Sequence, residues 1–274
     1  ATVGSLDDGA TYSFRIAAVN SIGTGPTSTA VDSKPVSNVD YAFDSNATSY
    51  ASLPAGSVIP AGSSDDFSVE MWFKADSLSG STMLMSQGTS AATYYLKLAG
   101  SRLVVHFNNQ ENDTGFDFVT GRWYHLAHTL DASDSSAGSK TYVDGTLVSS
   151  TSGTRQGYDP GSTSGFHVGT LSRNQTEIFN GQIDQVKIWN DVRTQSEVEA
   201  SMHAWGNPVS SDTSLISHYD FNDNTQSTTL RDQAGSNDLN YASVATSDLK
   251  PLVEKDTSAA GYGQYTFTRS YLTG

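Results

Sequence analysis

Asp184 places a carboxylate inside a stretch that otherwise alternates like a β-strand. In residues 183–189, Val186 and Ile188 alternate with polar or amphipathic residues, which is typical of a strand with two unlike faces. Strict alternation puts the Asp184 side chain on the face of Val186 and Ile188. A charge on the core side of a sheet is costly unless it is hydrogen-bonded, paired or bound to a metal.

A helix start follows this strand. Thr194 and Glu197 have the spacing of a capping box, in which the two side chains satisfy each other's backbone amides. The sequence therefore predicts a strand that carries a buried-side acid and then a short helix.

Hydrolytic chemistry is not indicated. Glucanases built from β-strands need acids at an E-x-D-x-x-E spacing on one strand face so that one carboxylate attacks and another donates a proton. Glutamates stand at positions 70, 111, 177, 197, 199 and 254, and none fits this spacing. His125 and His128 are three residues apart on a predicted strand and so face opposite sides. We expect a protein that is not an enzyme.

Composition limits the class of partner. The chain has 274 residues, no cysteine and a net charge of −14, from 15 basic and 29 acidic residues. Such a surface disfavours nucleic acid and anionic lipid, and it favours divalent cations. The absence of cysteine favours a bacterial source over a disulfide-bonded eukaryotic one.

No apolar run approaches the roughly 20 residues that span a bilayer, so membrane insertion is not expected. The first residues lack the features of a signal peptide. We expect an internal piece of a longer exported protein.

Short alternating segments separated by turn residues fill the middle of the chain. Strands are predicted at residues 39–44, 67–73, 94–98, 102–107, 123–130 and 165–169, with a hairpin over 140–148 that has Asp144-Gly145 at its tip. Many short antiparallel strands with one late helix predict an all-β, two-sheet jelly-roll sandwich.

The order of several motifs resembles one family. Residues 67–74 (FSVEMWFK), 123–127 (WYHLA), 142–145 (YVDG) and 215–222 (LISHYDFN) are similar to successive motifs of the laminin-G-like, pentraxin-like branch of the concanavalin A-type jelly rolls. The resemblance covers about three quarters of the chain. It implies a laminin-G-like domain over residues 36–246.

The resemblance also implies a structural calcium ion. In these jelly rolls an acid at the position of Asp184 binds calcium together with oxygens from the first strand, where Asp44 is the expected partner. Hydrogen bonds from backbone amides to Asp184 are the alternative. Arg173 interrupts the loop 171–177, where a pentraxin-style double-calcium site needs acids.

Glycan is the ligand that the resemblance implies. Sugar sites combine an aromatic platform with amides and charges on rim loops, and five residues are the candidates: Tyr94, Asn109, Tyr158, Arg173 and Asn174. The alternative for each is an ordinary solvated loop residue.

The two ends of the chain differ from the middle. Residues 1–35 carry the pattern L-x-x-G-x-x-Y-x-F-R-I-x-A-V-N-x-x-G-x-G-P, which resembles the last strands of a fibronectin type III domain. Such a partial sandwich is either the cut end of a tandem chain or is completed by a strand from another chain. Residues 247–274 are expected to be a linker and the start of a further module.

The sequence therefore predicts a non-catalytic adhesion or recognition module of a large extracellular or cell-surface protein, as in bacterial adhesins. Its partners would be a glycan or another cell-surface or matrix ligand and the neighbouring modules of the same polypeptide. A structural spacer in a fibre or adhesin stalk is one alternative. An accessory binding module of a secreted polysaccharide-degrading enzyme is the other.

Overall fold

The chain divides into two compact units, Ala1–Asp40 and Tyr41–Gly274. The computed structural model describes residues 12–15, 17, 19–21, 23–29, 31–33, 41–45, 47–53, 55–60, 62, 64–88, 93–107, 110–154, 165–202, 212–222, 228–243 and 252–254. The division falls a few residues after the expected boundary at position 35.

The described part of the first unit consists of two short antiparallel pairs. Strand β1 (Tyr12–Phe14) pairs with β4 (Val31–Ser33), and β2 (Val19–Asn20) forms a hairpin with β3 (Gly23–Thr24). The fibronectin type III identity of this unit stays a prediction.

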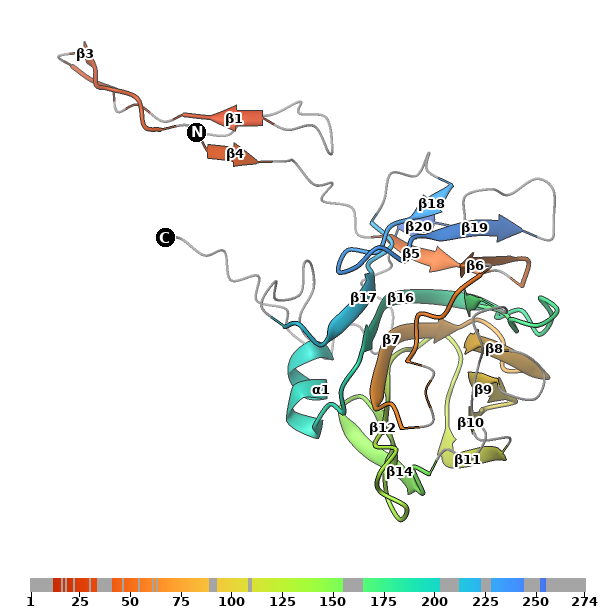
Figure 1. Ribbon diagram of the computed structural model, residues 1–274. Helices are drawn as coiled ribbons and strands as arrows, with labels where there is room; N and C mark the ends of the chain where they lie inside the picture. Colours follow the sequence, from red (N-terminus) through yellow and green to blue (C-terminus); the bar gives the residue numbers. More distant parts are fainter. Residues whose placement is uncertain are drawn as a thin grey trace. The chain divides into compact units, whose positions relative to one another are not determined.

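Two antiparallel sheets build the second unit (Figure 1). The first sheet has the order β11 (Gln110–Asp117), β10 (Arg102–Phe107), β9 (Tyr94–Ala99), β8 (Ser81–Gln87), β15 (Phe166–Val168), β6 (Ser49–Leu53), β19 (Leu239–Ser243) and β18 (Thr229–Leu230). The second sheet has the order β14 (Thr146–Thr151), β13 (Ser139–Val143), β12 (Trp123–Leu130), β7 (Phe67–Ala75), β16 (Gly181–Trp189), β5 (Tyr41–Asp44) and β20 (Leu252–Glu254), with β17 (Leu215–Tyr219) also paired to β16.

This architecture confirms the predicted all-β, two-sheet jelly roll with one short helix. Strand β20 pairs with β5 at the edge of the second sheet. The second sheet therefore extends beyond the predicted domain end at position 246. Among the described residues no helix is long and apolar enough to cross a membrane.

The space between the sheets is filled by one hydrophobic core. Strand β7 contributes Phe67, Val69, Met71 and Phe73 at every second position, all at 0% exposure. The residues between them are buried as well, on the outer face of the second sheet. Period-two alternation therefore separates two buried environments here, one apolar and one mixed.

A β-bulge in β16 changes which side chains face the core. Asp184 pairs with Trp72 and Lys187 with Glu70, so the strand carries one extra residue between these pairs. The extra residue is Gln185, whose φ of 50° lies in the left-handed region. Ile183 and Val186 both reach the core as a result.

The bulge overturns the predicted orientation of Asp184. Asp184 lies opposite Trp72, whose indole nitrogen donates to the Met202 carbonyl of the helix at 3.3 Å. It therefore lies on the outer face of the second sheet, away from Val186 and Ile188. The prediction was wrong because strict alternation leaves no room for an inserted residue.

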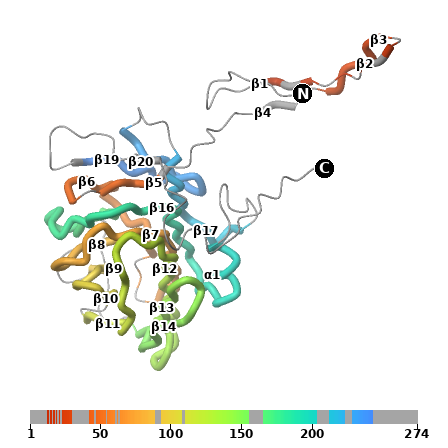
Figure 2. The backbone as a smooth tube through the Cα atoms, turned by 180° about the vertical axis from the view of Figure 1, so that it is seen from behind, coloured from red at the N-terminus to blue at the C-terminus, as the bar shows by residue number. Residues whose placement is uncertain are grey.

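Helix α1 (Gln195–Met202) covers part of this outer face (Figures 1 and 2). Its Val198 packs with Ala127 and Tyr142 of the second sheet. The predicted capping box is present, since the Thr194 amide donates to Glu197 Oε2 at 2.8 Å and the Glu197 amide donates to Thr194 Oγ1 at 3.4 Å. A capped, docked helix of only two turns is thereby held on the sheet.

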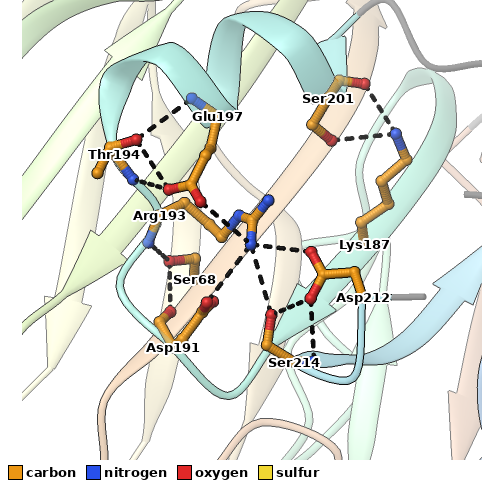
Figure 3. Close-up of polar contacts among 9 residues, drawn as sticks. All are labelled: Ser68, Lys187, Asp191, Arg193, Thr194, Glu197, Ser201, Asp212 and Ser214. Carbon is orange, nitrogen blue, oxygen red and sulfur yellow. Dashed lines mark hydrogen bonds and ion pairs between the residues drawn. The ribbon is translucent and has the colours of Figure 1, made fainter. Parts of the chain in front are cut away.

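Arg193 joins α1 to the strands around it (Figure 3). Its Nη1 lies 3.0 Å from Asp212 Oδ2 and 3.4 Å from Asp191 Oδ2. Its backbone amide donates to Ser68 Oγ of β7 at 2.8 Å, and that hydroxyl donates to the Asp191 carbonyl at 2.8 Å. The side chain is only 11% exposed, so these contacts form a partly desolvated network rather than a loose surface pair.

The bulge makes a matched pair of substitutions informative. Gln185→Val and Gln185→Gly both remove the hydrogen bond from His218 Nε2 to Gln185 Oε1, but only glycine adopts a φ of 50° without strain. We expect the valine variant to be less stable than the glycine variant by about 1–2 kcal/mol, measured by urea unfolding. Equal unfolding midpoints would contradict a left-handed bulge at this position.

Candidate functional site

The outer face of the second sheet gathers buried charges beneath α1. Glu70 on β7 and His125 on β12 are 1% and 2% exposed, with Glu70 Oε2 3.2 Å from His125 Nε2. Lys187 donates from Nζ to the Ser201 carbonyl of α1 at 2.9 Å (Figure 3). Burial lowers the pKa of Lys187, and the charges of Glu70 and Asp184 oppose that change. These charges offset one another beneath the helix and do not face solvent.

Asp184 and Asp44 lie on neighbouring strands of this sheet, as the calcium prediction requires. Asp44 pairs with Gln182, two residues from Asp184 along β16, and Phe43 beside it faces the core. Asp184 Oδ1 already accepts the Gln185 amide at 2.7 Å. The described residues contain no group of three or more acidic, histidine or cysteine side chains placed to hold a metal. The calcium site stays a prediction.

Tyr94 does not belong to a binding rim. Its side chain has 0% exposure, its hydroxyl lies 2.9 Å from His128 Nδ1, and its ring meets Phe67 edge to face at 5.1 Å between centroids. The prediction for Tyr94 was wrong because adjacent strand residues point to opposite faces, and here Tyr95 is the one that points outward.

Tyr95 organises a polar cluster on the outer face of the first sheet. Its ring stacks on His106 of β10 at 4.3 Å between centroids and 10° between planes. Its hydroxyl donates to Glu111 Oε1 of β11 at 2.5 Å. Lys97 pairs with the same carboxylate oxygen and lies 5.4 Å from the centre of the Tyr95 ring. Three adjacent strands thus contribute one aromatic pair and one ion pair.

The loop after β15 lies against this cluster. Leu171 packs with Met83 and Tyr95, and the Met83 amide donates to the Glu177 carbonyl at 2.8 Å. Arg173 is exposed on the same loop, and its charge acts on both Tyr95 and His106. We call Tyr95, Lys97, His106, Glu111 and Arg173 the Tyr95 face.

Asn174 lies beside Arg173 and is exposed. Its Oδ1 accepts a hydrogen bond from Thr176 Oγ1 at 2.7 Å, which fixes the amide within the turn. Ser81 Oγ donates to Glu177 Oε2 at 2.8 Å and ties the same loop to β8. The loop is therefore held at both ends, and it presents two predicted site residues together.

The local environment sets the charge states of this face. Hydrogen bonds from Lys97 and then from Tyr95 hold the pKa of Glu111 below its usual range. Burial lowers the pKa of His106, and the hydrogen bond between its Nδ1 and the Thr93 carbonyl at 2.6 Å opposes this change. Burial also raises the pKa of Tyr95, helped by its bond to Glu111. At neutral pH the face presents a carboxylate beside neutral rings and two cations.

Sequence reasoning located only part of this face. Arg173 and Asn174 lie beside it, whereas Asn109 and Tyr158 are outside the described residues. Lys97 and His106 were missed, although outward-facing positions can be read from alternation once Tyr95 is assigned to the outer face. Glu111 was missed because β11 is too polar to be recognised as a strand.

Residues 44–199, more than half of the chain, match the family described as the concanavalin A-like lectin/glucanases superfamily. The chain therefore belongs to this family of lectin-like jelly rolls, as the motif order predicted.

The proteins similar to this chain include a pentraxin-related protein and a bacterial protein of known structure. Over 162 residues the chain is 27% identical to the pentraxin-related protein PTX3 of Mus musculus, a match that covers 53% of this chain and 42% of that protein. The chain thus spans less than half of this relative's length. A structure of a candidate carbohydrate binding protein from Bacteroides ovatus ATCC 8483 covers 94% of this chain and is itself 72% covered, with a TM-score of 0.63 and 18% identity. At that identity the likeness shows the fold alone.

Two buried histidines make stability depend on pH. Burial lowers the pKa of His218 to about 3, with a further contribution from Lys187, and burial lowers that of His167 to about 4. Because the unfolded chain protonates near pH 6.5, it binds more protons than the folded chain below that pH. Stability is therefore complete above about pH 6.5 and falls as the pH drops toward 4.

Between pH 7 and 5 we expect urea unfolding to show a loss of up to about 2 kcal/mol for each of these two histidines. His218→Gln should make the loss smaller. The NMR shifts of the His218 ring should keep their neutral values down to pH 5. A ring that protonates near pH 6.5 in the folded protein would overturn the assignment.

Proposed function

We propose that this chain is a non-catalytic glycan-binding module of an extracellular, multidomain protein, and that the Tyr95 face binds the sugar. The observation that carries the proposal is an oriented carboxylate paired with a lysine above a buried aromatic pair on one outer sheet face, beside an exposed arginine on the adjoining loop. Membership of a lectin-like family and the fold of the Bacteroides ovatus protein support it.

The chemistry of the face suits carbohydrate. Sugar hydroxyls both donate and accept, so they match a carboxylate acceptor beside lysine and arginine donors. Hydrogen bonds to charged groups contribute about 1.5–3 kcal/mol each. The Tyr95 and His106 rings are each only 8% exposed, so they support and orient the Glu111 carboxylate from below rather than forming a stacking platform.

Absence of catalysis is part of the proposal. Glycosidases place two carboxylates on either side of the scissile bond. Glu70, the one glutamate on the strand that resembles the family's early motif, is 1% exposed and faces His125 beneath α1. It has no access to a substrate.

The wider setting is also proposed. An adhesin or another surface protein with adjoining modules would be consistent with the fibronectin-like pattern of residues 1–35, part of which forms antiparallel pairs. The alternatives are a spacer in an extracellular stalk and an accessory module of a polysaccharide-degrading enzyme. A spacer predicts no sugar binding, and an accessory module predicts a catalytic domain in the full-length polypeptide.

Arg173→Ala tests the face. Arg173 is exposed, so its removal should leave the melting temperature unchanged and should weaken glycan binding about tenfold, the effect of losing one charge-assisted hydrogen bond. Binding would be measured by a glycan array followed by calorimetry.

Arg102→Ala is the matched control. Arg102 is an exposed arginine of the first sheet, at the opposite end of β10 from His106, where it pairs with Asp117. The Arg102→Ala variant should bind glycan with the affinity of the wild type. Equal loss in both variants would place binding elsewhere, and no binding by the wild type would favour the spacer.

We also propose that calcium binds through Asp184 and Asp44 and stabilises the sandwich. A chelator should lower the melting temperature of the wild type, and calcium should restore it. Asp184→Asn should abolish the difference between chelator and calcium, whatever its own melting temperature. A wild type that melts identically in both would end the calcium hypothesis.

A further inference from the structure

Glu111 is a fixed acceptor on the Tyr95 face. It lies on β11, opposite His106 of β10, and its side chain is 48% exposed. The Tyr95 hydroxyl and the Lys97 ammonium both donate to Oε1. The carboxylate is therefore ionised and oriented before any ligand arrives. An ionised carboxylate accepts hydrogen bonds and cannot donate one.

The cations of the face are balanced by acids. Lys97 is only 13% exposed and pairs with Glu111. Arg173 lies on the loop that also carries Glu177, and the charges of Arg173, Glu177 and Glu111 all act on Tyr95. The surroundings of Tyr95 thus hold two cations and two carboxylates, within a chain of net charge −14. The face therefore offers an anionic ligand no net attraction at close range, and the charge of the whole chain repels it at long range.

From this balance of charges we propose that the Tyr95 face is selective for neutral saccharides whose hydroxyls donate to Glu111. This inference rests on the proposed function. A neutral hydroxyl gains a charge-assisted hydrogen bond to the carboxylate and accepts one from Arg173. A uronate or sialic acid carboxylate beside Glu111 would meet an ionised acceptor that has no proton to donate to it. The face then discriminates because a neutral hydroxyl can donate to Glu111 and a sugar carboxylate cannot.

A glycan array of matched pairs tests the selectivity. The pairs are galactose and galacturonate, glucose and glucuronate, mannose and mannuronate oligosaccharides, and lactose with sialyllactose. We expect signal on neutral members only, with little dependence on salt. Signal confined to acidic members would overturn the selectivity while leaving the proposed glycan-binding function intact.

Glu111→Gln tests whether the charge of this carboxylate causes the selectivity for neutral sugars. The glutamine keeps the size of the side chain but removes its charge, so affinity for a neutral sugar should fall about tenfold and discrimination against acidic sugars should shrink. Asp113→Asn is the control, because Asp113 is an exposed acid on the same strand that pairs with Arg102. It should change neither property. Unchanged affinity of Glu111→Gln for neutral sugars would overturn the role of Glu111. If the wild type bound no member of any pair, the proposed glycan-binding function itself would be wrong.

Discussion

The left-handed backbone conformation of Gln185 is the constraint on which the second sheet depends. The apolar residues of β16 are not spaced two apart throughout, since Ile183 and Val186 are three positions apart and both pack in the core. Only an inserted residue allows both to face inward while β16 keeps its pairing with β7 on either side. Without it, either Ile183 or the pair formed by Val186 and Ile188 would turn outward. The core and the polar outer face are thus fixed by one backbone conformation.

The same bulge explains why charges collect beneath α1. It sends Asp184 and Lys187 to the outer face, where Glu70 and His125 already lie, and the helix closes over them. The helix is short and is held by its capping box and by the contacts of Arg193 rather than by a wide apolar stripe (Figure 3). The outer face of the second sheet is therefore covered by α1, with buried charges of both signs beneath the helix. The Tyr95 face of the first sheet is where exposed charged side chains adjoin buried rings.

Sequence reasoning predicted the class of fold because motif order and period-two alternation are properties of the chain itself. It located the strands with clear alternation, such as β7 and β12, and the capped helix. It failed at Asp184 because a bulge depends on packing against a neighbouring strand. It chose Tyr94 over Tyr95 because two adjacent aromatic residues give no sign of which faces the core. The pairing of Lys97 and Glu111, 14 residues apart in the chain, follows only from the order of the strands.

Strand β11 ends the first sheet, and this position gives its acids a second consequence. An unpaired strand edge is a template on which another chain can add a strand and begin to aggregate. Glu111, Asp113 and Asp117 line this border with negative charge, and Arg102 pairs with two of them. Like charges would then meet if two copies approached edge to edge. The acidic composition that made β11 hard to recognise in the sequence therefore also disfavours the pairing of two copies at this strand.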